Sequence, residues 1–96
     1  MKQKITPARD FWARSEDGYW WRIAEGTGDN LTEKDVEDGY VDYIYYDYYA
    51  SLDDVKEDYV YDGGMILLEK LYKDHSLDEI VKIVEDFENV KLKVVE

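Results

Sequence analysis

The chain has 96 residues, with 24 Asp and Glu against 12 Lys and Arg, so its net charge is −12 at neutral pH. This length corresponds to a single domain, residues 1–96, with a modest core. The acidity disfavours direct contact with nucleic acid or with anionic membranes, because both require clustered Lys and Arg. The absence of cysteine excludes disulfides and thiolate metal sites. No apolar signal core follows Met1, so we expect a cytoplasmic protein.

The chain opens with segments that are typical of strands. Residues 2–6 have the composition of an edge strand ended by Pro7. Residues 19–24 form the next strand, in which Trp20 and Trp21 should point to opposite faces of the sheet. Two aromatic residues between these segments are expected to reach the core, Phe11 and Trp12.

A short helix is predicted over residues 31–38. Thr32 can cap its first turn, Asp35 three residues later can complete a capping box, and Gly39 can end it.

The central strand is predicted over residues 40–49, which hold six of the ten tyrosines. Tyrosine, valine and isoleucine fit a pleated, half-buried surface. We expect the odd-numbered face to pack inward, because it begins with the uncharged Val41 and Tyr43.

The second half of the chain alternates short elements. Residues 51–58 predict a helical turn capped by Ser51, residues 62–64 predict a turn, and residues 65–73 predict a helix. A capping box of Ser76 and Glu79 then opens the clearest helix, over residues 77–88. Its apolar face is Ile80, Val81, Val84 and Phe87, and a closing strand follows with Val90, Leu92 and Val94.

These elements together predict an α+β fold. We expect a small, mostly antiparallel sheet of three to four strands with helices packed on one face. The order of the strands cannot be deduced from these local signals.

The charge is concentrated in residues 25–62, which hold thirteen acids, two bases and eight of the ten tyrosines. The simplest interpretation is a solvated face that keeps the protein soluble. The functional interpretation is a surface that imitates DNA, which carries about one negative charge per 1.7 Å of axis. Tyrosines between carboxylates suit such a contact surface. The residues expected to contact the partner are Asp42, Asp47, Asp53, Asp54, Glu57, Asp58, Tyr46 and Tyr48.

Metal and catalytic motifs are weak. Residues 53–58 lack the glycine of a calcium loop and include Lys56, so no metal or cofactor is expected. His75 lies beside Asp74 and Ser76 at a helix start, where capping is the more common role than a catalytic triad. We therefore expect a protein that is not an enzyme.

Three segments carry a resemblance to a known group of proteins. Gly-Thr-Gly-Asp-Asn-Leu at 26–31, Asp-Gly-Tyr-Val-Asp-Tyr-Ile-Tyr-Tyr at 38–46 and Asp-Gly-Gly-Met-Ile-Leu-Leu at 62–68 together resemble small acidic proteins of conjugative transposons and related mobile elements of Gram-positive bacteria. The resemblance implies a bacterial, cytoplasmic, mobile-element setting and carries no catalytic residue. The composition is also similar in style to antirestriction proteins that mimic DNA.

The leading hypothesis is therefore a non-enzymatic acidic interaction protein whose partner is a basic protein surface, such as a DNA-binding enzyme. The second is a structural accessory module that forms a homodimer through the strand at residues 40–49. The third is a small enzyme with a carboxylate acid/base pair, which requires a pocket.

Overall fold

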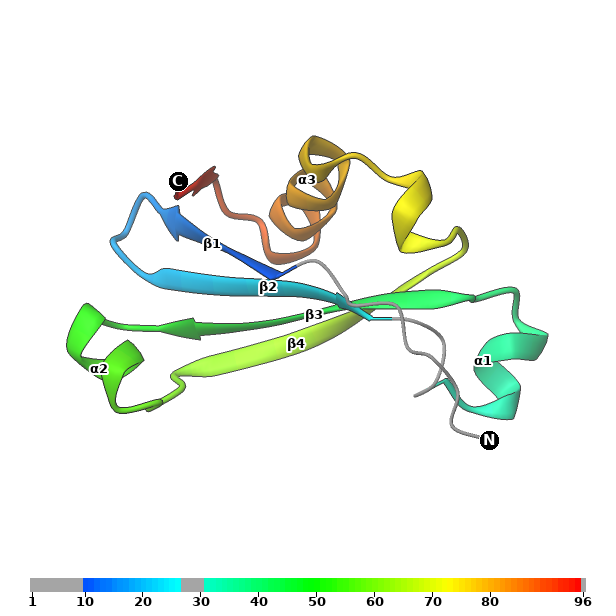
Figure 1. The fold of residues 1–96 in the computed structure, drawn as a ribbon, viewed down its shortest axis with the longest axis horizontal. Coiled ribbons are helices and arrows are strands. Elements are labelled where there is room, and N and C mark those ends of the chain that lie inside the picture. The colour runs from blue at the N-terminus through cyan, green and yellow to red at the C-terminus, as the bar shows by residue number, and fades with distance from the viewer. Residues whose placement is uncertain (1–9, 27–30, 96) are drawn as a thin grey trace, which may run out of the picture.

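The computed structural model describes residues 10–26 and 31–95, which form an α+β fold on one sheet (Figure 1). The sheet has five strands in the order β4-β3-β2-β1-β5, and all neighbours are antiparallel. The expected fold class is confirmed, with one strand more than predicted. The strands are β1 (Asp10–Ser15), β2 (Trp20–Gly26), β3 (Asp42–Tyr49), β4 (Asp62–Leu68) and β5 (Leu92–Val94). The helices are α1 (Glu33–Glu37), α2 (Leu52–Lys56), the 3-10 helix η2 (Tyr72–Asp74) and α3 (Leu77–Glu88).

Helix α3 covers one face of the sheet (Figure 1). Its Ile80 and Val84 are fully buried against Ile44 and Tyr46 of β3, together with Trp21 of β2. Trp20 lies on the opposite face, as the alternation of a strand requires. The expected edge strand at residues 2–6 lies outside the described residues.

The prediction that the odd face of β3 packs inward is wrong. The even face lies under α3, because it carries Ile44, the one aliphatic side chain of β3, which is fully buried there. Val41 precedes the strand and is exposed. Phe87 was expected on the apolar face of α3, yet it is 61% exposed.

The prediction for residues 62–73 is also wrong, because β4 replaces both the turn and the helix. β4 pairs with β3 along the edge of that strand, with Met65 opposite Tyr45 and Gly64 opposite Tyr46. A Cβ added to Gly64 would lie 2.6 Å from the hydroxyl oxygen of Tyr46. The glycine therefore permits close packing of a strand against a large ring and does not mark a turn.

The helix ends agree with the sequence. Capping boxes of Thr32 with Asp35 and of Ser76 with Glu79 open α1 and α3, and Ser51 caps α2. Gly39, which follows α1, has a φ of +97°. These predictions are confirmed. The sequence was sufficient for them because each cap depends only on residues close together in the chain.

Candidate functional site

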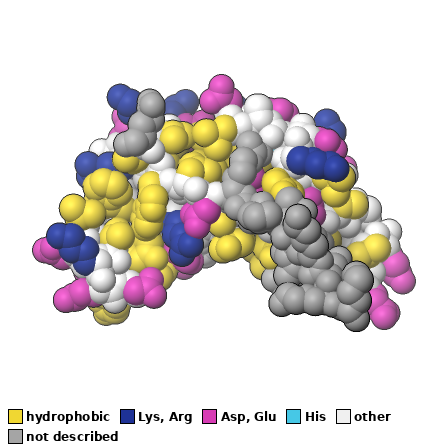
Figure 2. Space-filling view, in the orientation of Figure 1, with side chains coloured by type: hydrophobic (Ala, Val, Ile, Leu, Met, Phe, Trp, Pro, Cys, Tyr) yellow, Lys and Arg dark blue, Asp and Glu magenta, His cyan; other side chains and the backbone are white. Residues whose placement is uncertain are grey.

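The acids of residues 25–62 that the structure describes do not form one continuous row. Helices α1 and α2 lie at opposite ends of the long axis (Figure 1), and each brings its own group of carboxylates. Asp and Glu side chains are visible at both ends of the molecule in Figure 2. Between the two helices, Glu25 and Asp42 are buried. The fold therefore places the carboxylates of α1 and those of α2 in two separate clusters.

Two residues of the expected contact set are structural. Asp42 is 2% exposed, and its carboxylate accepts a 2.6 Å hydrogen bond from the backbone N–H of Tyr72. Tyr46 is 1% exposed, and its hydroxyl donates to the Glu88 carboxylate at the end of α3. Burial, and then the hydrogen bond to Glu88, raise the pKa of Tyr46 well above the ordinary tyrosine value. The expectation that Asp42 and Tyr46 contact a partner is therefore wrong.

Asp47 lies apart from the remaining residues of that set. It is half-buried on the face of the sheet that α3 does not cover, and the register places it opposite Arg22 of β2. Its surroundings are therefore mixed in charge.

The other five expected residues come together at the end of the molecule that carries α2. Asp53, Glu57 and Asp58 are exposed, and Asp54 is half-buried. The hydroxyl of Tyr49 donates a 3.1 Å hydrogen bond to Asp58, which ties the segment after α2 back to β3. Tyr48, the fifth, ends the even face of β3 and is half-buried.

Tyr48 belongs to a cluster of three tyrosine rings. The ring centroids lie 5.7 Å apart for Tyr19 and Tyr48, 5.8 Å for Tyr48 and Tyr61, and 5.3 Å for Tyr19 and Tyr61. Trp21 stacks on Tyr48 at 4.3 Å and so connects the cluster to the core. Burial, and then the charges of Asp62 and Glu88, raise the pKa of Tyr48. The cluster is anchored from beneath, while Tyr61 remains 64% exposed.

We call this surface the α2 end, and it comprises Tyr19, Tyr48, Tyr59, Tyr61, Asp53, Asp54, Glu57, Asp58 and Asp62. Tyr59 is 71% exposed, and its backbone N–H donates to the Asp54 carbonyl at 2.8 Å. The segment 48–62 holds five acids and one base, Lys56. The segment 31–40 at the opposite end holds four acids, one base and a single tyrosine. The tyrosines, more than the charge, distinguish the α2 end.

Sequence reasoning did not place Tyr19, Tyr59, Tyr61 and Asp62 in the site. The interpretation of residues 62–64 as a turn hid the position of Tyr61, which immediately precedes β4. Tyr19 comes from the turn before β2, and only the pairing of β2 with β3 brings it to Tyr48.

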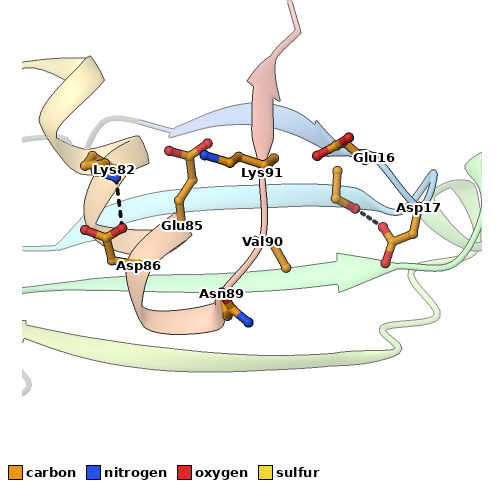
Figure 3. Close-up of a pocket in the computed structure, with 9 residues that line it drawn as sticks. Glu16, Asp17, Lys82, Glu85, Asp86, Asn89, Val90 and Lys91 are labelled. Carbon is orange, nitrogen blue, oxygen red and sulfur yellow. Dashed lines mark hydrogen bonds and ion pairs between the residues drawn. The ribbon is translucent and has the colours of Figure 1, made fainter.

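A separate hollow of about 400 Å³ lies between the β1–β2 turn, the end of α3 and the segment before β5 (Figure 3). Three of its four carboxylates have structural partners. Asp86 pairs with Lys82 at 3.0 Å, Glu85 accepts a 2.8 Å hydrogen bond from the Leu92 N–H, and Asp17 accepts one from the Ser15 hydroxyl. In Figure 3 the side chains of Glu85 and Lys91 point toward one another. The hollow gives no specific support to an acid/base pair.

Other candidate chemistry is equally limited. Ser76 is the N-cap of α3, and the Nδ1 atom of its neighbour His75 lies 3.8 Å from the Glu79 carboxylate. The Ser76 backbone N–H lowers the pKa of Glu79. Within residues 10–26 and 31–95, no three His, Asp or Glu side chains are placed to hold a metal ion. None of the helices in those ranges is long and apolar enough to cross a membrane.

Comparison with protein-family models, with curated proteins and with solved structures found no match to this chain.

Proposed function

We propose that this protein is a non-enzymatic interaction protein that binds a basic protein surface through the α2 end. The observation that carries the proposal is that exposed acids and exposed tyrosines occur together at one end of the molecule. The ring of Tyr61 packs on Tyr48, which in turn stacks on the buried Trp21. Asp53, Glu57 and Asp58 supply charge, and Tyr59 and Tyr61 supply contact area.

The physical roles of the two residue types are complementary. Carboxylates steer a basic partner toward the surface and pair with its Lys and Arg side chains. Tyrosine rings bury area at low entropic cost and attract cationic groups to their faces. Because Tyr19 and Tyr48 pack beneath Tyr61, the exposed ring is held in place before binding. Such preorganisation reduces the entropy lost on association.

The first test compares two matched pairs of substitutions. Asp53→Asn with Glu57→Gln removes two exposed charges spaced four residues apart at α2. Glu33→Gln with Glu37→Gln does the same at α1 and gives the same net charge. The probe is an arginine-rich peptide, with a glutamine-substituted version as its control. We expect the α2 pair to weaken binding about fivefold and the α1 pair less than about twofold, because exposed ion pairs contribute only modestly.

Salt and the tyrosine rings give separate readouts. Binding should weaken steeply as ionic strength rises from about 0.05 M to about 0.3 M. Tyr61→Leu keeps the charge and should still cost about threefold in affinity. Equal losses for the α1 and α2 pairs would show that the net charge alone attracts the peptide, and they would overturn the assignment to the α2 end.

Imitation of DNA is the narrower form of the proposal. It requires a row of acids with the spacing of phosphates, whereas α1 and α2, each with its own carboxylates, lie at opposite ends of the molecule. Its test is the addition of the protein to restriction endonucleases that cleave a plasmid. Inhibition that Asp53→Asn with Glu57→Gln relieves would support this form, and unchanged cleavage would remove it while leaving the broader proposal standing. The cytoplasmic, mobile-element setting stays a prediction from the sequence.

A further inference from the structure

The sheet face opposite α3 differs from the rest of the molecule in both composition and charge. The register places Trp12, Arg22 and Asp47 side by side across three strands, and Arg14, Trp20 and Tyr49 form the next row. Tyr45 and Met65 continue the face on β3 and β4. Figure 2 shows hydrophobic side chains gathered over the strands, with charged groups of both signs among them. We call this surface the open face.

The aromatic side chains of the open face are packed together: Tyr49 is buried, whereas Trp12 and Trp20 are half-buried. Trp12 lies 6.5 Å from Trp20 and 5.8 Å from Tyr49 between ring centroids, and the Arg14 guanidinium lies 4.6 Å from the Trp20 ring centroid. Tyr45 is 39% exposed and Met65 is 50% exposed. Exposed large hydrophobic side chains that adjoin one another on a sheet indicate a surface that binds a partner.

The charge of the open face is close to balanced. The described acids on its strands are Asp10 and Asp47, and Asp58 adjoins it through the Tyr49 hydroxyl. The described bases on its strands are Arg14, Arg22 and Lys93, which pairs in register with Arg14. Arg22 and Asp10 form an ion pair at 2.6 Å. The whole chain, in contrast, carries −12. The open face is therefore a surface on which a strongly acidic partner meets little repulsion.

We propose that the open face binds a second copy of this chain in a two-fold dimer. A two-fold interface brings the same surface of both copies together, so it must be complementary to itself. The open face meets this condition, since it combines apolar rings with both guanidinium and carboxylate groups. Because two such acidic chains repel one another over most of their surface, the nearly neutral face is where they can approach.

The size of the open face sets the strength of this association. Five strands spaced about 4.8 Å apart and roughly six residues long give an upper limit of about 450 Å² on each copy, because Ala24, Tyr43 and Tyr49 on this face are already buried. A standard interface buries about 800 Å² on each partner, so we expect a weak dimer that forms with increasing protein concentration. Added salt should strengthen it by screening the repulsion between the chains. This is the opposite of the salt effect expected for a basic partner at the α2 end.

Sedimentation equilibrium of the full chain tests the proposal, with four variants that each add one negative charge. Tyr45→Glu and Met65→Glu place that charge on the open face, whereas Val36→Glu and Phe87→Glu place it on exposed apolar side chains elsewhere. We expect the mass of the natural chain to approach that of a dimer at high concentration and high salt. The two controls should behave likewise, and Tyr45→Glu and Met65→Glu should weaken association at least about tenfold.

Circular dichroism tests whether each variant is folded. If Tyr45→Glu unfolds, Met65→Glu still tests the open face, because Met65 is more exposed than Tyr45. A natural chain that stays monomeric at every concentration and salt level would overturn the proposal. Equal weakening by the control substitutions would overturn it too, because dimerisation would then not involve the open face. Either failure leaves the binding of a basic partner at the α2 end untouched.

Discussion

At the scale of single residues, the tyrosines have different roles although they lie close together in the sequence. Tyr46 is part of the core and bonds to Glu88, Tyr48 supports a surface cluster, and Tyr45 is exposed on the open face. These roles follow from the alternation of side chains along β3 and from the limited extent of α3. Composition therefore predicted a tyrosine-rich surface, but it could not indicate which rings are exposed on it.

The hydrogen bond of Tyr46 gives the first prediction about stability. Tyr46→Phe removes the hydroxyl that donates to Glu88 and should lower the free energy of unfolding by about 1–2 kcal/mol. The effect should be measured by urea denaturation. Tyr45→Phe, which removes a hydroxyl from an exposed ring, is the control and should change stability by less than about 0.5 kcal/mol.

The raised pKa of Tyr46 also has a consequence at alkaline pH. The folded chain retains this proton above the ordinary tyrosine pKa, while the unfolded chain loses it, so stability should fall as pH rises beyond about 10. The fall should be less steep in Tyr46→Phe. Some slope should persist, because the pKa values of Tyr19, Tyr48 and Tyr49 are raised as well. Identical slopes in both proteins would contradict the burial of the Tyr46 hydroxyl.

At the scale of elements, the contrast between α3 and β4 shows what local sequence can predict. The capping box and the spacing of Ile80 and Val84 define α3 within a dozen residues. The run Met-Ile-Leu-Leu in β4 is too short for its periodicity to separate a helix from a strand. What decides its conformation is pairing with the edge of β3, whose partner residues lie 14 to 26 residues earlier in the chain. Helix α2 was predicted because its cap, Ser51, is adjacent in the sequence. The contribution of Tyr19 to the α2 end was not predicted, because it depends on the pairing of β2 with β3.

The packing of β4 against β3 gives a second stability prediction. Replacement of a glycine by alanine within a strand ordinarily stabilises a protein, because glycine loses more entropy on folding. At Gly64 the added Cβ would meet the buried Tyr46 ring, with 2.6 Å to its hydroxyl oxygen. Gly64→Ala should therefore destabilise the fold by about 1–3 kcal/mol.

A double-mutant cycle identifies the cause of that loss. In the Tyr46→Phe background the closest contact is absent, so Gly64→Ala should cost less than it does in the natural chain. Thermal or urea unfolding of the four proteins measures the coupling. Additive effects would show that the Tyr46 hydroxyl is not the obstacle to a larger residue at position 64.

At the scale of the whole molecule, the fold redistributes a charge that the sequence places in one continuous segment. The acids of residues 31–40 and 53–62 lie at opposite ends of the molecule, exposed tyrosines accompany those at the α2 end, and the open face is nearly neutral. A solubilising role for the acids explains their exposure, yet it does not explain why exposed tyrosines accompany one of the two clusters. The molecule therefore has two surfaces of different character: the acidic, tyrosine-bearing α2 end, for which we propose a basic partner, and the nearly neutral open face, for which we propose a second copy of the chain.

The most direct test of the account is a map of where a basic ligand binds. Amide chemical shifts of the isotopically labelled chain should be followed during titration with the arginine-rich peptide at low salt. We predict that the largest changes fall on Tyr19 and residues 48–62, with smaller changes at α1. Changes that are greatest at α1, or that spread evenly over all exposed acids, would contradict a binding site at the α2 end.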